Sequence, residues 1–290
     1  MDRTYRWQTG FYDTTRAFLL PGRDRLLRGV LDALPGHDGS VPPAGLDGGA
    51  ADGVLAVLEV GCGTGRNLAW LARHASLLPF PSAPSTPPTT STAPTAPTTS
   101  KPLPRLRLCG VDISEVMLET ARRRLRGHLG EPRATSSGGL RDTAAATRQT
   151  GSPPERAGSR RSAEPTPPHV SVTLARGAAE ELRGIHDLCG QAPFDAVYFS
   201  YSLSMMPEPA RALAEASRLL RTGGTVHVID FAASRNARGG LGRRVLDGWL
   251  ALWGVHGLQA ETLGLEAGLH FHEVEWLRGG ISVLARGRRS

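Results

Sequence analysis

The feature that most constrains this chain is an apolar run that ends in a glycine-rich turn, VLAVLEVGCGTGRN. Its first part, VLAVLEV at 54–60, is almost continuously apolar, which is typical of a strand buried on both faces. Gly61, Gly63 and Gly65 follow it, and glycine at these positions lets the backbone turn tightly and approach a ligand closely. RNLAWLARHA then has the spacing of an amphipathic helix. Strand, loop and helix together predict a nucleotide-type binding turn.

The spacing of the loop argues against two common nucleotide sites. The dinucleotide fingerprint G-x-G-x-x-G needs a glycine where Arg66 stands, so an NAD site is disfavoured. No G-x-x-x-x-G-K-[ST] is present, which excludes a P-loop. Glu59 before the loop suits a ligand with an ammonium group better than one with phosphates. The three cysteines form no C-x-x-C pair, so we expect no structural metal.

The rest of the chain alternates strand and helix signals. Strands are predicted at 105–112, 170–177, 194–201 and 225–231. Helices are predicted at 113–125, with Ser114 as the N-cap, and over PARALAEASRLLRTGG, closed by Gly223 and Gly224. EVEWLRGGISVLAR (273–286) predicts a closing antiparallel hairpin. Such alternation requires parallel strands joined by right-handed crossovers, so we expect a doubly wound α/β sheet with helices on both faces.

Two biased segments interrupt this pattern. Residues 79–104 hold nine prolines among Ser, Thr and Ala, and residues 127–169 are rich in Gly, Ser, Arg and Pro. Neither segment can bury enough apolar surface to offset its ordering entropy, so both are predicted to be disordered, with only a weak helix signal at 140–148. We therefore expect an N-terminal helical cap segment at 1–35. A single domain at 53–290, interrupted by the two inserts, should follow it.

The net charge of +7 and the isoelectric point near 10.1 do not predict nucleic-acid binding. Many of the arginines fall in the low-complexity stretch 126–161 and in the C-terminal tail, and the chain has a single lysine, Lys101. No apolar run reaches the roughly 20 residues of a spanning helix, and the N-terminus lacks the apolar core of a signal peptide. We expect a cytoplasmic protein.

Peripheral membrane contact is a second expectation. Within 243–258, the apolar residues Val245, Leu246, Trp249, Leu250 and Trp253 recur at helical spacing. This face is wide enough to meet a lipid surface, and a basic chain is attracted to anionic headgroups. The alternative is a core helix beneath a cap.

The glycine loop preceded by Glu59 resembles the first motif of the class I S-adenosylmethionine-dependent methyltransferases, an acidic residue followed by G-x-G-x-G. The resemblance implies a Rossmann-like, mostly parallel seven-stranded sheet and S-adenosylmethionine as the cofactor. In the loop it implies cofactor contacts by Glu59, Gly61, Cys62, Gly63 and Gly65.

The resemblance extends to later strand ends. Asp112, which ends the second strand, would hold the ribose hydroxyls, and Ile113 would pack against adenine. In GAAEEL the family usually has an aspartate where Ala178 stands, which leaves the Ala179 backbone and Glu180 to bind the adenine amino group. The segment FDAVYFSYSLSMM is similar to the fourth motif, and its strand end at Phe199, Ser200 and Tyr201 would lie beneath the methionine part of the cofactor.

Three further strings are similar to the betaine-lipid N-methyltransferases: YRWQTGFYDTTRAFLLPGRDRLL, YFSYSLSMMP, and VIDF followed by a Trp-rich region. This finer resemblance implies trimethylation of the amino group of diacylglyceryl-homoserine. Two alternatives stay open. One is a methyltransferase of a quinone or of a soluble small molecule, and the other is a noncatalytic cofactor-binding module.

Methylation of an amine requires a neutral nitrogen held in line with the methyl group, and a group or water path that accepts its proton. The candidate catalytic residues are Tyr12, Tyr201 and Asp230. His227 is a fourth candidate base, although its place in the alternating strand TVHVID is typical of a packed residue. Aromatic walls for the growing positive charge are expected from Tyr5, Trp7, Tyr12 and Tyr201. Arg16 or Arg25 would bind a substrate carboxylate.

Overall fold

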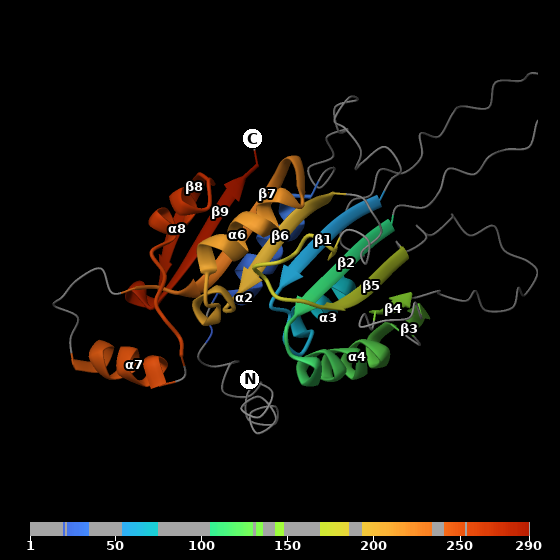
Figure 1. Cartoon of the computed structure of the whole chain (residues 1–290), viewed down its shortest axis with the longest axis horizontal. Helices are drawn as coiled ribbons and strands as arrows, with labels where there is room; N and C mark the ends of the chain where they lie inside the picture. Colours follow the sequence, from blue (N-terminus) through green and yellow to red (C-terminus); the bar gives the residue numbers. More distant parts are fainter. Residues whose placement is uncertain are drawn as a thin grey trace, which may run out of the picture.

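A nine-stranded sheet organises the computed structural model, with strand order β3-β4-β5-β2-β1-β6-β7-β9-β8 (Figure 1). The structure describes residues 20, 22–34, 54–74, 105–129, 132–135, 143–147, 169–185, 193–233, 241–252 and 254–289.

Five parallel strands form the centre of the sheet: β1 (Val54–Val60), β2 (Arg105–Asp112), β5 (His169–Arg176), β6 (Phe194–Ser200) and β7 (Leu220–Phe231). The hairpin of β8 (Phe271–Leu277) and β9 (Ser282–Arg288) pairs antiparallel with β7. These seven strands confirm the expected doubly wound, mostly parallel sheet with a C-terminal antiparallel hairpin. The chain turns between β8 and β9 at the 3₁₀ helix η3 (Arg278–Gly280), where Gly279 and Gly280 have positive φ.

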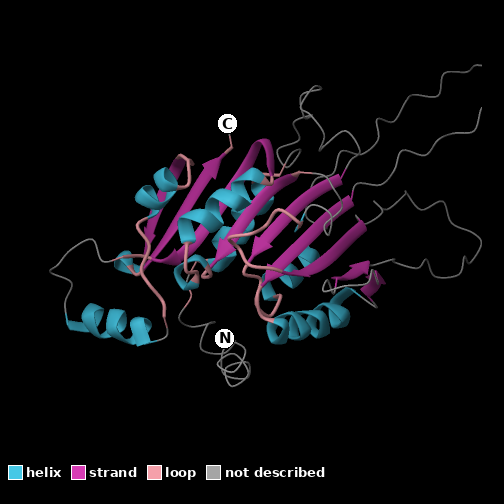
Figure 2. Ribbon diagram, in the orientation of Figure 1, coloured by secondary structure: helices cyan, strands magenta, loops and turns pink. Residues whose placement is uncertain are grey.

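Helices cover both faces of the sheet (Figure 2). The helices α2 (Arg23–Asp32), α3 (Arg66–His74) and α4 (Glu115–Leu129) pack on one face. The helices α6 (Pro209–Arg218) and α8 (Ala260–Glu266) pack on the other. A short 3₁₀ helix, η2 (Leu203–Met205), follows β6. Helix α7 (Leu241–Leu252) lies apart from the sheet (Figure 1).

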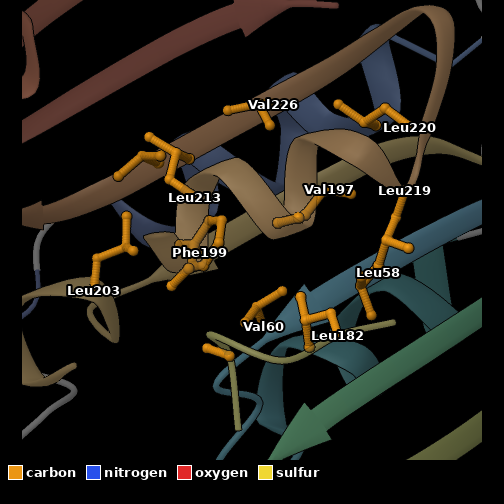
Figure 3. Close-up of a cluster of buried hydrophobic side chains, with 14 of the residues drawn as sticks. Leu58, Val60, Leu182, Val197, Phe199, Leu203, Leu213, Leu219, Leu220 and Val226 are labelled. Carbon is orange, nitrogen blue, oxygen red and sulfur yellow. The ribbon is translucent and has the colours of Figure 1, made fainter. Parts of the chain in front are cut away.

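The apolar run of β1 explains how one strand supports two cores. Leu55 and Val57 belong to the core beneath α2, α3 and α4, whereas Leu58 and Val60 belong to the core beneath α6 and α8. Figure 3 shows Leu58 and Val60 among the side chains of this second core. Burial of a leucine side chain stabilises the fold by roughly 1.5–3 kcal/mol. Because both faces are covered, the strand shows no alternation of polar and apolar residues.

The expectation that 127–169 is wholly disordered is wrong at three places. Helix α4 continues to Leu129, and two short strands, β3 (Pro132–Thr135) and β4 (Thr143–Thr147), follow it. Within the weak helix signal at 140–148, residues Thr143–Thr147 form a strand instead, and this strand, β4, pairs antiparallel with β5. Backbone pairing explains the difference, because without β4 the edge of β5 would expose a row of unpaired backbone N–H and C=O groups. Amino-acid composition does not predict such pairing.

Smaller differences concern the ends of elements. The helix predicted to end at Gly223 and Gly224 stops at Arg218, and β7 already begins at Leu220, with a register irregularity before Thr225. Helix α8 was not predicted. Residues 75–104, which include the first insert, and residues 1–19 of the expected N-terminal cap segment lie outside the described residues.

Candidate functional site

A cavity of about 380 Å³ lies where the parallel strands β1, β2, β5 and β6 end. Carboxyl ends of neighbouring parallel strands are the usual place for ligands in open α/β sheets. The cavity is lined by Val60, Gly61, Gly63, Val111, Asp112, Ile113, Met117, Gly177, Ala178, Ala179, Glu180, Glu181, Tyr201, Ser202, Met205, Met206, Pro207 and Glu208. Residues predicted from four separate sequence segments therefore meet in one cavity.

The three loop glycines all have positive φ, but they serve different needs: φ is 75° at Gly61, 52° at Gly63 and 68° at Gly65. A Cβ added at Gly61 would lie 2.5 Å from Cβ of Ser202, and one at Gly65 would lie 2.9 Å from Cβ of Ala121. A Cβ at Gly63 would meet no atom within 4 Å. Close packing thus requires glycine at Gly61 and Gly65, whereas Gly63 faces open space beside the cavity, where a ligand could approach the backbone.

Asp112 lies at the cavity wall and is oriented by backbone donors. Its Oδ2 accepts a hydrogen bond from the Gly63 N–H at 2.8 Å, and its Oδ1 accepts one from the Ser114 N–H at 2.9 Å. Ser114 Oγ also accepts a bond from the Met117 N–H at 3.4 Å, as expected of an N-cap. A carboxylate offers about four lone-pair directions. The backbone contacts therefore fix the orientation of the Asp112 carboxylate. A carboxylate in this position can accept hydrogen bonds from ribose hydroxyls.

Two further loops complete the wall expected to face adenine. Ile113 follows β2 and is 51% exposed, an unusual exposure for a large apolar side chain next to a buried strand. The loop after β5 brings Ala178, Ala179 and Glu180 to the same cavity. Ala178 stands where the similar family usually has an acidic side chain, and Glu180 supplies a carboxyl group two residues later.

Glu59 does not line the cavity; it lies beneath the glycine loop and is 1% exposed. Its Oε1 accepts a bond of 2.6 Å from Nδ2 of Asn67 on α3. Burial raises the pKa of Glu59 to about 8, although the Asn67 bond and the nearby Arg23 guanidinium act in the opposite direction. The contact links the end of β1 to the start of α3 and so supports the loop between them. A direct contact from Glu59 to the cofactor stays a prediction.

Three other predicted contact residues also lie outside the cavity lining: Cys62, Gly65 and Ser200. Burial raises the pKa of the Cys62 thiol well above its ordinary value, and a Cβ at Gly110 would lie 3.0 Å from its Sγ. Cys62 therefore packs against β2 as a small residue. Ser200 is 6% exposed and ends β6 directly before the cavity residue Tyr201.

Tyr201 lines the cavity with an unusual backbone conformation, φ 54°. A bulky residue rarely adopts this left-handed region, and such strain occurs often at ligand sites. The Tyr201 hydroxyl donates to Oγ of Ser282 at 3.0 Å, and its ring makes an edge contact with Phe231 at a centroid distance of 5.1 Å. Burial raises the pKa of Tyr201 above its ordinary value. The ring is held in place, and the hydroxyl stays protonated at neutral pH.

Asp230 and His227 do not line the cavity. Asp230 is fully buried, and its two oxygens accept bonds from the Ser204 N–H at 3.1 Å and the Phe231 N–H at 2.8 Å. It therefore links the end of β7 to η2. His227 is 2% exposed, its Nε2 lies 3.1 Å from Oγ1 of Thr225, and burial lowers its pKa to about 3. At neutral pH His227 is an uncharged, packed side chain.

The part of the cavity wall formed by η2 and its flanking residues was not predicted from the sequence. Ser202, Met205 and Met206 all line the cavity, and Oγ of Ser202 donates to the Val60 carbonyl at 2.8 Å. The string YFSYSLSMMP contained these residues, but no periodicity or charge pattern pointed to their positions. A 3₁₀ turn of three residues has too short a repeat to be predicted from hydrophobic spacing.

Four of the expected substrate-binding side chains lie outside the described residues: Tyr5, Trp7, Tyr12 and Arg16. Arg25 is described, and its guanidinium bonds to Glu275 of β8 at 2.5 Å, away from the cavity lining. The proposed role of Arg25 as a clamp for a substrate carboxylate therefore gains no support from the geometry.

The chain resembles known methyltransferases in sequence family and in fold. An O-methyltransferase family protein from Burkholderia thailandensis is 13% identical, with a TM-score of 0.51 over 93% of this chain and 55% of that one. A SAM dependent methyltransferase from Aquifex aeolicus is 13% identical, with a TM-score of 0.47 over 95% of this chain and 93% of that one. Magnesium protoporphyrin IX methyltransferase from Synechocystis PCC 6803, solved with bound SAH, is 15% identical, with a TM-score of 0.49 over 92% and 82%.

At 13% identity the Burkholderia thailandensis structure shows a shared fold alone, and the chain spans little more than half the length of that protein. No curated protein matches the sequence. The family model described as a methyltransferase domain, however, matches residues 22–263, which is most of the chain and includes every described residue that lines the cavity. The chain therefore belongs to this methyltransferase-domain family and is an S-adenosylmethionine-dependent methyltransferase.

Proposed function

We propose that the enzyme transfers methyl groups to the amino group of a lipid headgroup, diacylglyceryl-homoserine, and forms the trimethylated betaine lipid. The observation that carries this proposal is the charge of the cavity wall. Its lining includes the carboxylates Asp112, Glu180, Glu181 and Glu208 and no Lys, Arg or His among the described residues. An acidic wall of this kind favours cationic ligands.

The acidic charge is partly balanced at the outer edge of the cavity. Arg211 lies 3.3 Å from Glu208 and 3.9 Å from Glu181. Oε1 of Glu180 is buried and has no hydrogen-bond partner among the described residues. S-adenosylmethionine carries a sulfonium and an ammonium group, and each methylated product carries a cationic ammonium group as well. A phosphate-bearing acceptor would be repelled, and a neutral quinone would gain nothing from this charge.

The residues of the cavity fit S-adenosylmethionine. Asp112 would accept hydrogen bonds from the ribose hydroxyls, and Ile113 would cover one side of adenine. The space over Gly63 lets the cofactor approach the loop backbone. The Ala179 backbone and Glu180 would receive the adenine amino group. The cofactor, when bound, supplies the electrophilic methyl group, so the chain needs no covalent nucleophile. Its residues bind, orient and exclude water.

Tyr201 would act as an aromatic wall. Its hydroxyl donates to Ser282, and burial keeps its pKa high, so it is a poor proton acceptor. Its ring, positioned by Phe231, can stabilise an ammonium group by a cation–π contact of roughly 0.5–2 kcal/mol. We propose that Asp230 positions η2 and that the proton of the acceptor amine leaves through Tyr12 or through solvent.

The test is transfer of label from methyl-labelled S-adenosylmethionine. Purified protein is added to a lipid extract of cells that express a homoserine-lipid synthase, and the lipids are separated by charge and mass. The expected result is label in a zwitterionic polar lipid that carries up to three methyl groups. Asp112→Ala serves as the control for cofactor-dependent transfer.

Two other outcomes would reject the proposed acceptor. Label only in neutral quinones or in water-soluble material would keep the methyltransferase activity and discard the lipid amine. Absence of label from every fraction, with cofactor binding measured by calorimetry, would favour a noncatalytic cofactor-binding module.

A further inference from the structure

Helix α7 carries an exposed apolar stripe, formed by Val245, Trp249 and Leu252. These residues are spaced by four and three positions, so they lie on one side of the helix. Their side chains are 64%, 44% and 84% exposed. Only two other large apolar side chains of the described chain, Ile113 and Leu265, are exposed. Single exposed apolar residues are ordinary, whereas an aligned set marks an interaction surface.

The stripe is distinct from the side of α7 that packs. Leu250, on the other side, is 5% exposed, and its carbonyl accepts a hydrogen bond of 3.1 Å from the Val255 N–H. In Figure 1, α7 lies apart from the sheet, towards the edge at which the arrowheads of β1 and β2 end. The three exposed residues belong to neither of the two hydrophobic cores.

The charge of the segment complements an anionic surface. Between Ala233 and Leu258 the sequence has four arginines, one aspartate and no lysine or glutamate. Two of these, Arg243 and Arg244, are in the first turns of α7. Basic residues beside an apolar helix face, with a tryptophan on that face, are typical of helices that lie at the surface of anionic membranes.

The chain after α7 is bonded to the wall of the cavity. The His256 N–H donates to the Ser204 carbonyl at 3.0 Å, and Ser204 belongs to η2, which lines the cavity through Met205. The Leu258 N–H donates to the Phe231 carbonyl at 2.8 Å, at the end of β7. A surface that α7 contacts would therefore lie beside the end of the sheet that holds the cavity.

We propose that the α7 stripe binds the surface of a bilayer that contains anionic lipid. No helix in the parts of the chain that the structure describes is long and apolar enough to cross a membrane. The 12 residues of α7 extend about 18 Å, so the helix lies along the membrane surface with the stripe inserted between headgroups. This inference rests on the proposed function. A diacyl acceptor resides in a bilayer, so an enzyme that methylates it must reach the bilayer surface.

The test is co-sedimentation of the full chain with vesicles, in the absence of any methyl acceptor. Vesicles of phosphatidylcholine with phosphatidylglycerol are compared with vesicles of phosphatidylcholine alone. We expect sedimentation with the anionic vesicles, weaker binding at high salt, and a loss of at least about tenfold in Val245→Asp/Trp249→Asp. Leu265→Asp is the matched control, because Leu265 is 76% exposed on α8 and should leave binding unchanged.

Methyl transfer to lipid dispersed in detergent micelles separates this inference from the proposed function. The double variant should keep transfer in micelles and lose it on vesicles. Transfer without vesicle binding would overturn the docking surface alone, and vesicle binding without transfer would overturn the lipid acceptor alone. Equal sedimentation of wild type and double variant would also reject the stripe. Light scattering that shows a dimer in wild type and a monomer in the double variant would assign the stripe to a second copy of the chain and reject the membrane.

Discussion

The Asp112 carboxylate accepts a hydrogen bond of 2.8 Å from the backbone N–H of Gly63. One residue ends β2 and the other is in the loop after β1, so the contact joins the two neighbouring strand ends that border the cavity. The acidic strand end and the glycine loop are therefore held together by a bond within the chain itself.

Replacement of Asp112 by alanine should weaken cofactor binding. Hydrogen bonds to a charged group contribute roughly 1.5–3 kcal/mol, so we expect the affinity for S-adenosylmethionine to fall by at least about tenfold in calorimetry. Circular dichroism should show a retained fold. Glu261→Ala, on the exposed side of α8, is the control. Unchanged affinity in Asp112→Ala would reject the ribose assignment.

Alanine at two of the loop glycines should have different effects. Gly63→Ala adds a methyl group in open space at φ 52°, so it should cost about 1–2 kcal/mol of folding free energy and abolish cofactor binding by obstructing the approach to the loop. Gly61→Ala also clashes with Ser202 and should destabilise the fold further. Urea denaturation and calorimetry measure the two effects. Tight cofactor binding by Gly63→Ala would contradict the proposed position of the ligand.

Glu59 should make the cofactor-free enzyme less stable as pH rises. Its pKa is about 8 in the folded protein and 4.5 ordinarily, so between these values the folded state binds more protons than the unfolded chain. The free energy of unfolding therefore falls as pH increases through this window. Glu59→Gln removes this slope, and its stability relative to wild type should be higher at pH 8 than at pH 5 by at least about 1 kcal/mol. Parallel stability curves would count against the raised pKa.

His227 provides the opposite slope on the acid side. Its pKa is about 3 in the folded protein and 6.5 ordinarily, so the unfolded chain binds more protons between these values and stability falls as pH decreases. We expect His227→Gln to flatten the stability profile below pH 6.5 and to leave the profile between pH 7 and 8 unchanged. Chemical denaturation at several pH values distinguishes the two residues. A change confined to the alkaline side would be inconsistent with a neutral, packed His227.

Tyr201 should tolerate loss of its hydroxyl better than loss of its ring. Tyr201→Phe removes the bond to Ser282, at a cost of about 0.5–1.5 kcal/mol, and keeps the aromatic wall. Its rate of methyl transfer should stay within about tenfold of wild type, whereas Tyr201→Ala should lose more. Steady-state kinetics with the labelled cofactor measures both. A much larger loss of transfer rate in Tyr201→Phe would instead support a role for the hydroxyl as the proton acceptor.

Long apolar runs, and the glycines that follow them, were sufficient to predict the central strands and the helices α3 and α4. The bounds of β1 and β2 agree with the predicted ranges, because buried parallel strands are continuously apolar and their ends are marked by Glu59–Gly61 and by Asp112. The strands β3 and β4 were not predicted, because what places them is backbone pairing with β5 rather than side-chain burial.

The resemblance to the methyltransferase family implied that Asp112, Ile113 and Ala178 contact one cofactor, and all three line the cavity. It could not distinguish side chains at the cavity from those one residue earlier in a strand. Glu59, Ser200 and Asp230 adjoin cavity elements, but all three are buried and lie outside the cavity lining. Glu59 bonds to Asn67 of α3, and Asp230 bonds to the Ser204 N–H of η2. Contacts between elements far apart in sequence decide such orientations.

The direction of the parallel strands determines where residues can be inserted or deleted at a distance from the cavity. The segment between His74 and Arg105 enters the sheet at the amino end of β2, and the segment between Thr147 and His169 enters it at the amino end of β5. The cavity lies at the opposite, carboxyl ends of these strands. Growth or shrinkage of the chain at these two junctions is thus separated by the full length of a strand from the chemistry. They are the natural positions for grafting a reporter or an affinity tag without altering the active site.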